Sequence, residues 1–212
     1  LTFTPTDTAH YNIVTVKVAV ALRTVAVIYD SSLTTAKSYH GTIESALRSA
    51  VSGDTVLVNP DATGKLYITE NITISSGVTL ILPYGEYSTS LAEVYNQKNS
   101  SGHYEATKYG KILETTAETC TTLVTVKSGV TIPSNGNIII AGILSGGHAG
   151  HDCGATAGAH ARLSLETDAA LVLNSGSNTD CLGYIVDAPG TEGGSVTVKD
   201  GATMLQPFVI YD

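Results

Sequence analysis

A nine-residue phrase recurs four times in this chain, at intervals of 52, 39 and 33 residues. The copies are NITISSGVT (71–79), LVTVKSGVT (123–131), RLSLETDAA (162–170) and SVTVKDGAT (195–203). Each alternates apolar and polar residues over a short strand, reaches a turn, and leads into a second apolar run. Such self-similarity is typical of repeat architectures, in which successive coils stack and bury one continuous core. The repeat therefore predicts an all-β solenoid.

One coil of this solenoid should contain three short strands and three turns. Residues 123–144 supply a coil of 22 residues, which is the order of length that repeat architectures use. Third strands are expected at 137–144, 181–188 and 207–212. Because stacked coils place like residues above one another, the strand before each turn should contribute to one internal row. That row is predicted to contain Ile74, Val126, Leu165 and Val198.

A short amphipathic helix is expected at 42–51, ahead of the first copy. Apolar residues recur there at helical spacing, Thr42 can cap the N-terminus, and Gly53 stands where a C′ glycine belongs. Asp54 most simply closes the turn into a strand at 55–58. This helix followed by SGDTVLV resembles the N-terminal cap of right-handed parallel β-helices, the solenoids of pectate lyases and many adhesins. The resemblance implies a right-handed parallel β-helix over 41–212, with residues 23–40 as a linker and first strand.

Residues 1–22 predict a β-hairpin remnant. Thr2-Phe3-Thr4 alternates, Pro5–Thr8 forms a turn, and a second alternating run follows through Val14 to Val20. FTPTDTAHYNIVTVKVAV resembles the last two strands of the bacterial immunoglobulin-like repeats of Gram-positive surface proteins. This resemblance implies that 1–22 are the C-terminal strands of such a repeat.

Three further segments, NIIIAGILSGG, CLGYIVDAPG and GATMLQPFVIYD, are similar to parts of very large Firmicutes cell-surface proteins built from β-helices. The resemblance implies an extracellular, cell-surface or cell-wall location, and it carries over no active-site residue. We expect the chain to be part of a longer one.

Composition excludes some partners. The formal net charge of −8 and a count of 11 Lys and Arg argue against nucleic acid, which needs clustered cations. No stretch approaches the roughly 20 apolar residues of a membrane span. The three cysteines (Cys120, Cys153 and Cys181) are too few for a disulfide scaffold, and their spacing leaves any pairing open.

The irregular intervals between copies predict two inserted loops, at 84–118 and 145–161. Loops on solenoids often carry the binding function. The first loop contains nearly half of the tyrosines in the chain: Tyr84, Tyr87, Tyr95, Tyr104 and Tyr109. Tyrosine rings can stack on sugar faces or fill a protein interface, which makes these five candidate ligand-binding residues. The alternative is that the rings pack the loop onto the coils.

The second loop, GGHAGHDCGATAGAH, predicts a candidate zinc site. His148, His151, Cys153 and His160 are residue types that bind Zn²⁺, although their spacing matches no standard zinc motif. The alternative is a loop of small residues with exposed histidines. Zn²⁺ is the one cofactor that the sequence suggests.

An enzymatic function is the main alternative to a structural one. Polysaccharide lyases and glycoside hydrolases of this architecture need clustered acids, whereas Asp152, Asp168, Asp180 and Asp187 are scattered along the chain. We therefore expect a non-catalytic, adhesin-like module whose loops bind host or cell-wall glycans or surface proteins. A fragment of a polysaccharide-active enzyme and a metal-binding loop module stay open as alternatives.

Overall fold

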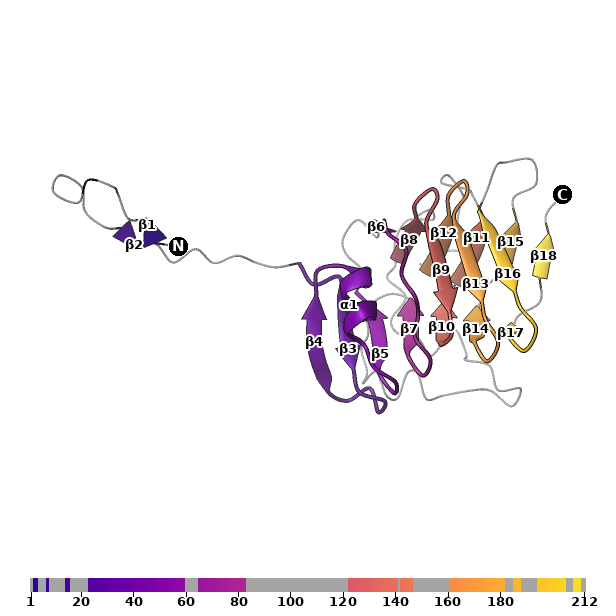
Figure 1. Ribbon diagram of the computed structural model, residues 1–212, viewed down its shortest axis with the longest axis horizontal. Coiled ribbons are helices and arrows are strands. Elements are labelled where there is room, and N and C mark those ends of the chain that lie inside the picture. Colours follow the sequence, from indigo (N-terminus) through magenta and orange to yellow (C-terminus); the bar gives the residue numbers. More distant parts are fainter. Residues whose placement is uncertain are drawn as a thin grey trace, which may run out of the picture.

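The computed structural model describes residues 2–3, 7, 14–15, 23–59, 65–82, 122–140, 142–146, 161–181, 185–187, 194–204 and 208–210. Within these residues the protein is mostly β-structure, with parallel sheets and one short helix (Figure 1). The described part of the chain holds no helix with the length and apolar character needed to cross a membrane.

The first two strands form a sheet of their own. β1 (Thr2–Phe3) pairs antiparallel with β2 (Val14–Thr15). An antiparallel strand pair within residues 1–22 is therefore confirmed. Of the turn predicted at Pro5–Thr8, only Asp7 belongs to the described residues.

Residues 23–40 contain two strands, where the sequence predicted a linker and a single strand. β3 (Ala26–Tyr29) pairs antiparallel with β4 (Ala36–His40), and on its other side it pairs antiparallel with β5 (Thr55–Val58). The carboxylate of Asp30 shapes the connection, because its Oδ1 accepts hydrogen bonds from Ser32 Oγ (2.8 Å) and Thr34 N (3.2 Å). The sheet thus begins with an antiparallel hairpin.

The predicted helix is present as α1 (Ile43–Ser49), and Thr42 caps it by accepting a hydrogen bond from Ser45 N at 3.0 Å. The prediction for Gly53 is wrong, because the helix already ends at its C-cap, Ala50. Gly53 has φ +91° in the following turn, where Asp54 N donates to Val51 O. Asp54 closes this turn as predicted, since its Oδ2 accepts a hydrogen bond from Val51 N at 3.1 Å.

Three sheets hold the remaining strands (Figure 1). The seven-stranded sheet has the order β17-β14-β10-β7-β5-β3-β4, the six-stranded sheet the order β18-β15-β11-β12-β8-β6, and the three-stranded sheet the order β16-β13-β9. Strands added to the seven-stranded sheet are β7 (Thr79–Leu82), β10 (Asn137–Ile140), β14 (Asn178–Cys181) and β17 (Thr203–Met204). The six-stranded sheet contains β6 (Lys65–Ile68), β8 (Thr122–Val126), β11 (Gly142–Gly146), β12 (Ala161–Leu165), β15 (Ile185–Asp187) and β18 (Phe208–Ile210). The three-stranded sheet contains β9 (Thr131–Ser134), β13 (Ala170–Leu173) and β16 (Ser195–Val198).

From β8 onward the chain visits these sheets in a fixed order. It passes from the six-stranded to the three-stranded and then to the seven-stranded sheet as β8-β9-β10, as β12-β13-β14 and as β15-β16-β17. Every strand pair formed among these elements is parallel and in continuous register. The third strands expected at 137–144 and 181–188 are each divided between two sheets, because β10 ends at Ile140 and β14 at Cys181.

The repeated phrase occurs at two different connections between sheets. At 123–131 and 162–170 it joins the six-stranded to the three-stranded sheet, and Val126 lies opposite Leu165. At 71–79 and 195–203 it joins the three-stranded to the seven-stranded sheet.

The prediction of one internal row is therefore wrong. Ile74 forms an isolated bridge to Ser134 of β9, and Val198 pairs with Leu173 of β13, both in the three-stranded sheet. Val126 and Leu165 belong to the six-stranded sheet. The four residues form two rows.

The same turn geometry occurs at both kinds of connection between sheets, and this explains why they share a sequence pattern. Among the described residues, five turns that join one sheet to another have a residue at positive φ in their third position: Gly77, Gly129, Asp168, Gly176 and Gly201, with φ between 59° and 81°. A positive φ at that position alone defines a type II turn, which favours glycine. In each turn the next residue donates its N–H back to the first, as Val78 does to Ser75. The phrase thus marks a turn whose fourth residue is apolar and packs into the core.

The first copy lacks a full strand because of Pro133. Ile74 N donates to Pro133 O, and Asn135 N donates to Ile74 O. The nitrogen of Pro133 faces the same side as its carbonyl but has no hydrogen to donate. Pairing therefore stops at the single bridge between Ile74 and Ser134.

The six-stranded sheet departs from sequential stacking. β12 lies between β8 and β11, although β11 precedes it in the chain. Two adjacent parallel strands need a connection of about a dozen residues or more. This geometry accounts for the extra residues predicted as the loop at 145–161, whose first two residues belong to β11 and whose last belongs to β12.

Apolar side chains from all three sheets fill the interior, and α1 contributes Ile43 and Leu47. Thr179 of β14 is a polar residue in an interior row whose neighbouring members, Leu80 and Ile138, are apolar. It is 1% exposed, and its hydroxyl has no hydrogen-bond partner among the described residues.

Replacement of Thr179 by valine should stabilise the protein. Thr179→Val keeps the shape of the side chain and removes a buried hydroxyl without a partner, so we expect the free energy of unfolding to rise by about 1 kcal/mol. Urea denaturation followed by circular dichroism measures this change. Thr197→Val on the exposed surface of β16 is the control, with little change expected. A loss of stability in Thr179→Val would show that the hydroxyl is satisfied.

Candidate binding surface

The ligand-binding and metal-binding residues predicted from the sequence lie outside the described residues. This applies to Tyr84, Tyr87, Tyr95, Tyr104 and Tyr109 and to His148, His151, Cys153 and His160. They stay predictions. Elsewhere, the described residues contain no group of three or more His, Cys, Asp or Glu side chains that could hold a metal ion.

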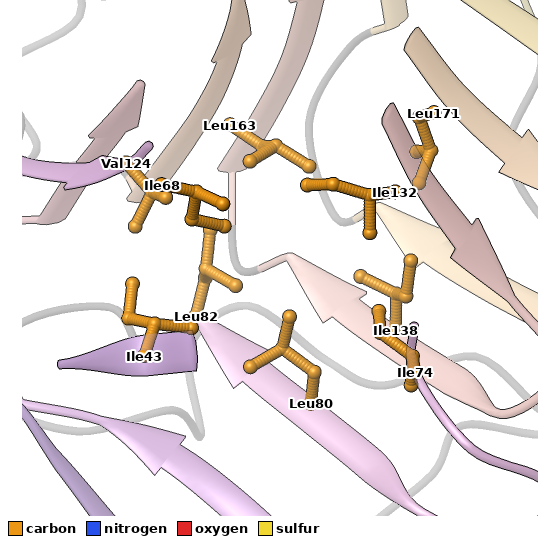
Figure 2. A pocket seen from close by; sticks show the side chains of 10 residues that line it. All are labelled: Ile43, Ile68, Ile74, Leu80, Leu82, Val124, Ile132, Ile138, Leu163 and Leu171. Carbon is orange, nitrogen blue, oxygen red and sulfur yellow. The ribbon is translucent and has the colours of Figure 1, made fainter. Parts of the chain in front are cut away.

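The interior cavity that the described residues line is too small for a ligand. Ten apolar side chains surround a cavity of about 10 Å³, which is no more than one water molecule needs. Figure 2 shows these side chains pointing toward one another, among them Ile43 of α1, Leu163 of β12 and Leu171 of β13. The cavity is a packing gap in the core.

A series of three side chains crosses the outer face of the six-stranded sheet. Tyr67 belongs to β6, Lys127 follows β8, and Glu166 follows β12. In each strand the neighbouring residue, Ile68, Val126 or Leu165, is buried. Since side chains alternate between the faces of a strand, Tyr67, Lys127 and Glu166 lie on the opposite, outer face. We call them the Tyr67–Glu166 series.

Contacts between adjacent strands fix the series. Lys127 Nζ lies 5.0 Å from the centre of the Tyr67 ring and 2.5 Å from Glu166 Oε1. Glu166 Oε2 also accepts a hydrogen bond from Ser128 N at 3.1 Å. The hydrogen bond from Lys127 lowers the pKa of the Glu166 carboxyl below its usual value. Glu166 is therefore an ionised acceptor with both oxygens engaged.

The same face stays open to solvent around Tyr67. Tyr67 is 51% exposed, and the Lys127 side chain is 42% exposed. Across the sheet, the residues in register with Tyr67 are small: Thr125 is half-buried and Ser164 is buried. The phenol ring is therefore exposed at one end of the series, next to the ammonium group of Lys127, whereas the face is covered at Ser164.

Helix α1 supports the edge of this surface. Glu44 is buried, and its Oε1 accepts a hydrogen bond from Thr69 N at 2.8 Å, directly after β6. Arg48 forms an ion pair with Glu70 at 2.7 Å. Both contacts fix the end of the strand that carries Tyr67.

The chain matches no family model, and neither a curated protein nor a solved structure is found to be similar to it. Functional inference for this chain therefore depends on its own geometry.

Sequence reasoning missed the Tyr67–Glu166 series, although a signal was present. Tyr67 stands between two apolar residues in KLYI, so alternation alone places it outside. Lys127 and Glu166 occupy the same position in two copies of the phrase and carry opposite charges. Aligning those copies as neighbouring strands would have paired them.

Proposed function

We propose that residues 41–212 form a right-handed parallel β-helix that acts as a non-catalytic structural and adhesive module on a cell surface or cell wall. The observation that carries this proposal is the fixed order in which the chain visits three sheets, with parallel pairing between successive visits. Parallel connections in one sheet are almost always right-handed. Such a tube is a stiff support from which loops can project.

Polar ladders on the outer faces support the same proposal. Asn174 Nδ2 donates to Asn135 Oδ1 at 2.9 Å, and Asn178 Nδ2 donates to Asn137 Oδ1 at 3.1 Å. Ladders of stacked amides stabilise repeated parallel strands without a catalytic purpose. They favour a structural role for these faces.

The ion pairs of the described acids also favour a non-catalytic role. Asp54 pairs with Lys37 at 2.6 Å, and Glu166 pairs with Lys127 at 2.5 Å. Glycoside hydrolysis requires two carboxyl groups facing one substrate bond. Each of these carboxylates is instead held by its own cation.

The insertions at 84–118 and 145–161 are the proposed adhesive elements, with the five tyrosines of the first as contacts to glycans or surface proteins. The antiparallel pair β1–β2 supports the further proposal that residues 1–22 end an immunoglobulin-like stalk repeat. An extracellular location is part of the same proposal.

A glycan array combined with a hydrolysis assay tests this function. We expect the purified chain to bind immobilised glycans or surface proteins and to release no fragments from soluble polysaccharides. Replacing 84–118 with a short Gly-Ser linker should reduce binding while circular dichroism still reports β-structure. Release of reducing ends or unsaturated sugars would contradict a non-catalytic role.

A further inference from the structure

We propose that the insertion at 84–118 docks through its apolar side chains on the outer face of the seven-stranded sheet. The docking surface is a row of four apolar residues on adjacent strands, which we call the outer apolar row: Val27 of β3, Leu57 of β5, Ile81 of β7 and Ile139 of β10. The inference concerns how the insertion is held and does not depend on what the insertion binds.

The outer apolar row lies opposite the core. Its members are paired in register from one strand to the next. On β7 and β10 the neighbouring residues Leu80, Leu82 and Ile138 line the interior cavity (Figure 2). Since side chains alternate between the two faces of a sheet, the row faces outward.

All four side chains of the row are nevertheless buried, with exposed fractions between 1% and 6%. Large side chains at outer positions of the other two sheets are more open, since Tyr67 is 51% exposed and Val172 is half-buried. The continuous apolar runs of β5, β7 and β10 (TVLV, TLIL and NIII) are also typical of parallel strands that are covered on both faces. The seven-stranded sheet is therefore covered on its outer face as well.

The described elements do not supply this cover. Helix α1 and the other two sheets lie on the interior side of the seven-stranded sheet, since Ile43, Val124 and Leu171 all line the interior cavity. The cover therefore comes from a segment outside the described residues. Three of those segments contain no leucine, isoleucine, valine, methionine, phenylalanine or tyrosine: 60–64, 147–160 and 188–193.

Residues 83–121 have the position that a cover requires. They follow β7, and Ile81 of that strand is the least exposed member of the row at 1%. Residues 16–22, another apolar segment, instead precede β3 at one end of the row. Elsewhere the chain passes from the seven-stranded to the six-stranded sheet through residue 141 alone or through 182–184. Most of 83–121 is therefore not needed to connect β7 with β8 and is available to cover the strands beside β7.

The insertion also has the apolar side chains that this contact requires: Leu91, Val94, Ile112 and Leu113. Soluble proteins rarely leave a large contiguous apolar patch open to water, and burial of such a patch is favourable in proportion to its area. Docking fixes the insertion to the sheet, so its other side chains lose less entropy when they bind a partner.

The rate at which a thiol reagent modifies a cysteine placed in the row tests the docking. Ile139→Cys is made in a chain whose three native cysteines are replaced by serine, with and without replacement of 84–118 by a Gly-Ser linker. Because a buried thiol is inert, we expect slow modification of Ile139→Cys in the full chain and a rate about tenfold higher after the replacement. Ile138→Cys is the matched control, since it faces the interior and should stay protected in both chains. Val198→Cys, at a position that is 44% exposed, should react in both.

A second variant keeps the test independent of the linker. In the full-length chain, Leu91→Ser, Val94→Ser, Ile112→Ser and Leu113→Ser combined should also raise the modification rate of Ile139→Cys. Rapid modification in the unaltered chain, or protection that persists in both variants, would overturn the inference. An equal rise for Ile138→Cys would do the same, because the insertion would then be part of the core. Protection that is lost on dilution would assign the row to a second copy of the chain instead. Absence of glycan binding in the array would refute the proposed function and leave these rates unchanged.

Discussion

Leu171→Ala is expected to lower the free energy of unfolding by about 2–5 kcal/mol, the range measured when a buried leucine is truncated. Leu171 of β13 has 0% exposure and lines the existing interior cavity. Because Leu171 already borders a packing gap, its truncation would enlarge that gap instead of being filled by neighbouring side chains. Urea denaturation followed by far-ultraviolet circular dichroism measures the loss, because the chain contains no tryptophan for fluorescence.

The adjacent residue is the matched control for this prediction. Val172 lies on the same strand but on its outer face, where it is half-buried. We expect Val172→Ala to cost about 1 kcal/mol or less, since it removes less buried surface. Equal losses in the two variants would contradict the assignment of Leu171 to an enclosed interior. A large difference would establish that β13 has one face in the core.

Local sequence signals predicted the start of α1 and the turns of the repeated phrase, although the helix ends before the predicted position. The helix follows from the cap at Thr42 and the spacing of its apolar residues, which are properties of one short segment. The type II turns follow from glycine in the third position, and Asp168 fits the pattern because aspartate is one of the few residues that tolerate positive φ. Both signals are independent of what the segment packs against.

Strand pairing could not be predicted in the same way. The phrase at 71–79 and the phrase at 123–131 share alternation and a turn, yet they join different pairs of sheets. Only long-range pairing distinguishes the two steps. The position of β12 between β8 and β11 has the same cause, because no local pattern records which earlier strand a later one will join.

The candidate site was missed for a related reason. The sequence predicts ligand-binding tyrosines in the long insertion, where they are numerous, while Tyr67 is a single residue inside a strand. Its partners, Lys127 and Glu166, are separated by 39 positions in the sequence and meet only because β8 and β12 are adjacent. The aligned copies of the phrase indicate the pairing of Lys127 with Glu166, but the position of Tyr67 beside Lys127 depends on the register between β6 and β8.

Gly136→Ala should be among the most destabilising substitutions, with an expected loss of about 3 kcal/mol, at the upper end of the cost of overpacking. An added Cβ would lie 2.3 Å from Val78 O and 2.5 Å from Ser75 O. Neither oxygen can retreat freely, because Val78 O accepts a hydrogen bond from Asn137 N and Ser75 O accepts one from Val78 N. Gly129→Ala is the control: its Cβ meets nothing within 4 Å, so only the φ of +74° opposes it, at about 1–2 kcal/mol. Thermal and urea denaturation of both variants would separate the two costs. If Gly129→Ala proved the more damaging, backbone conformation would outweigh the close stacking of successive turns.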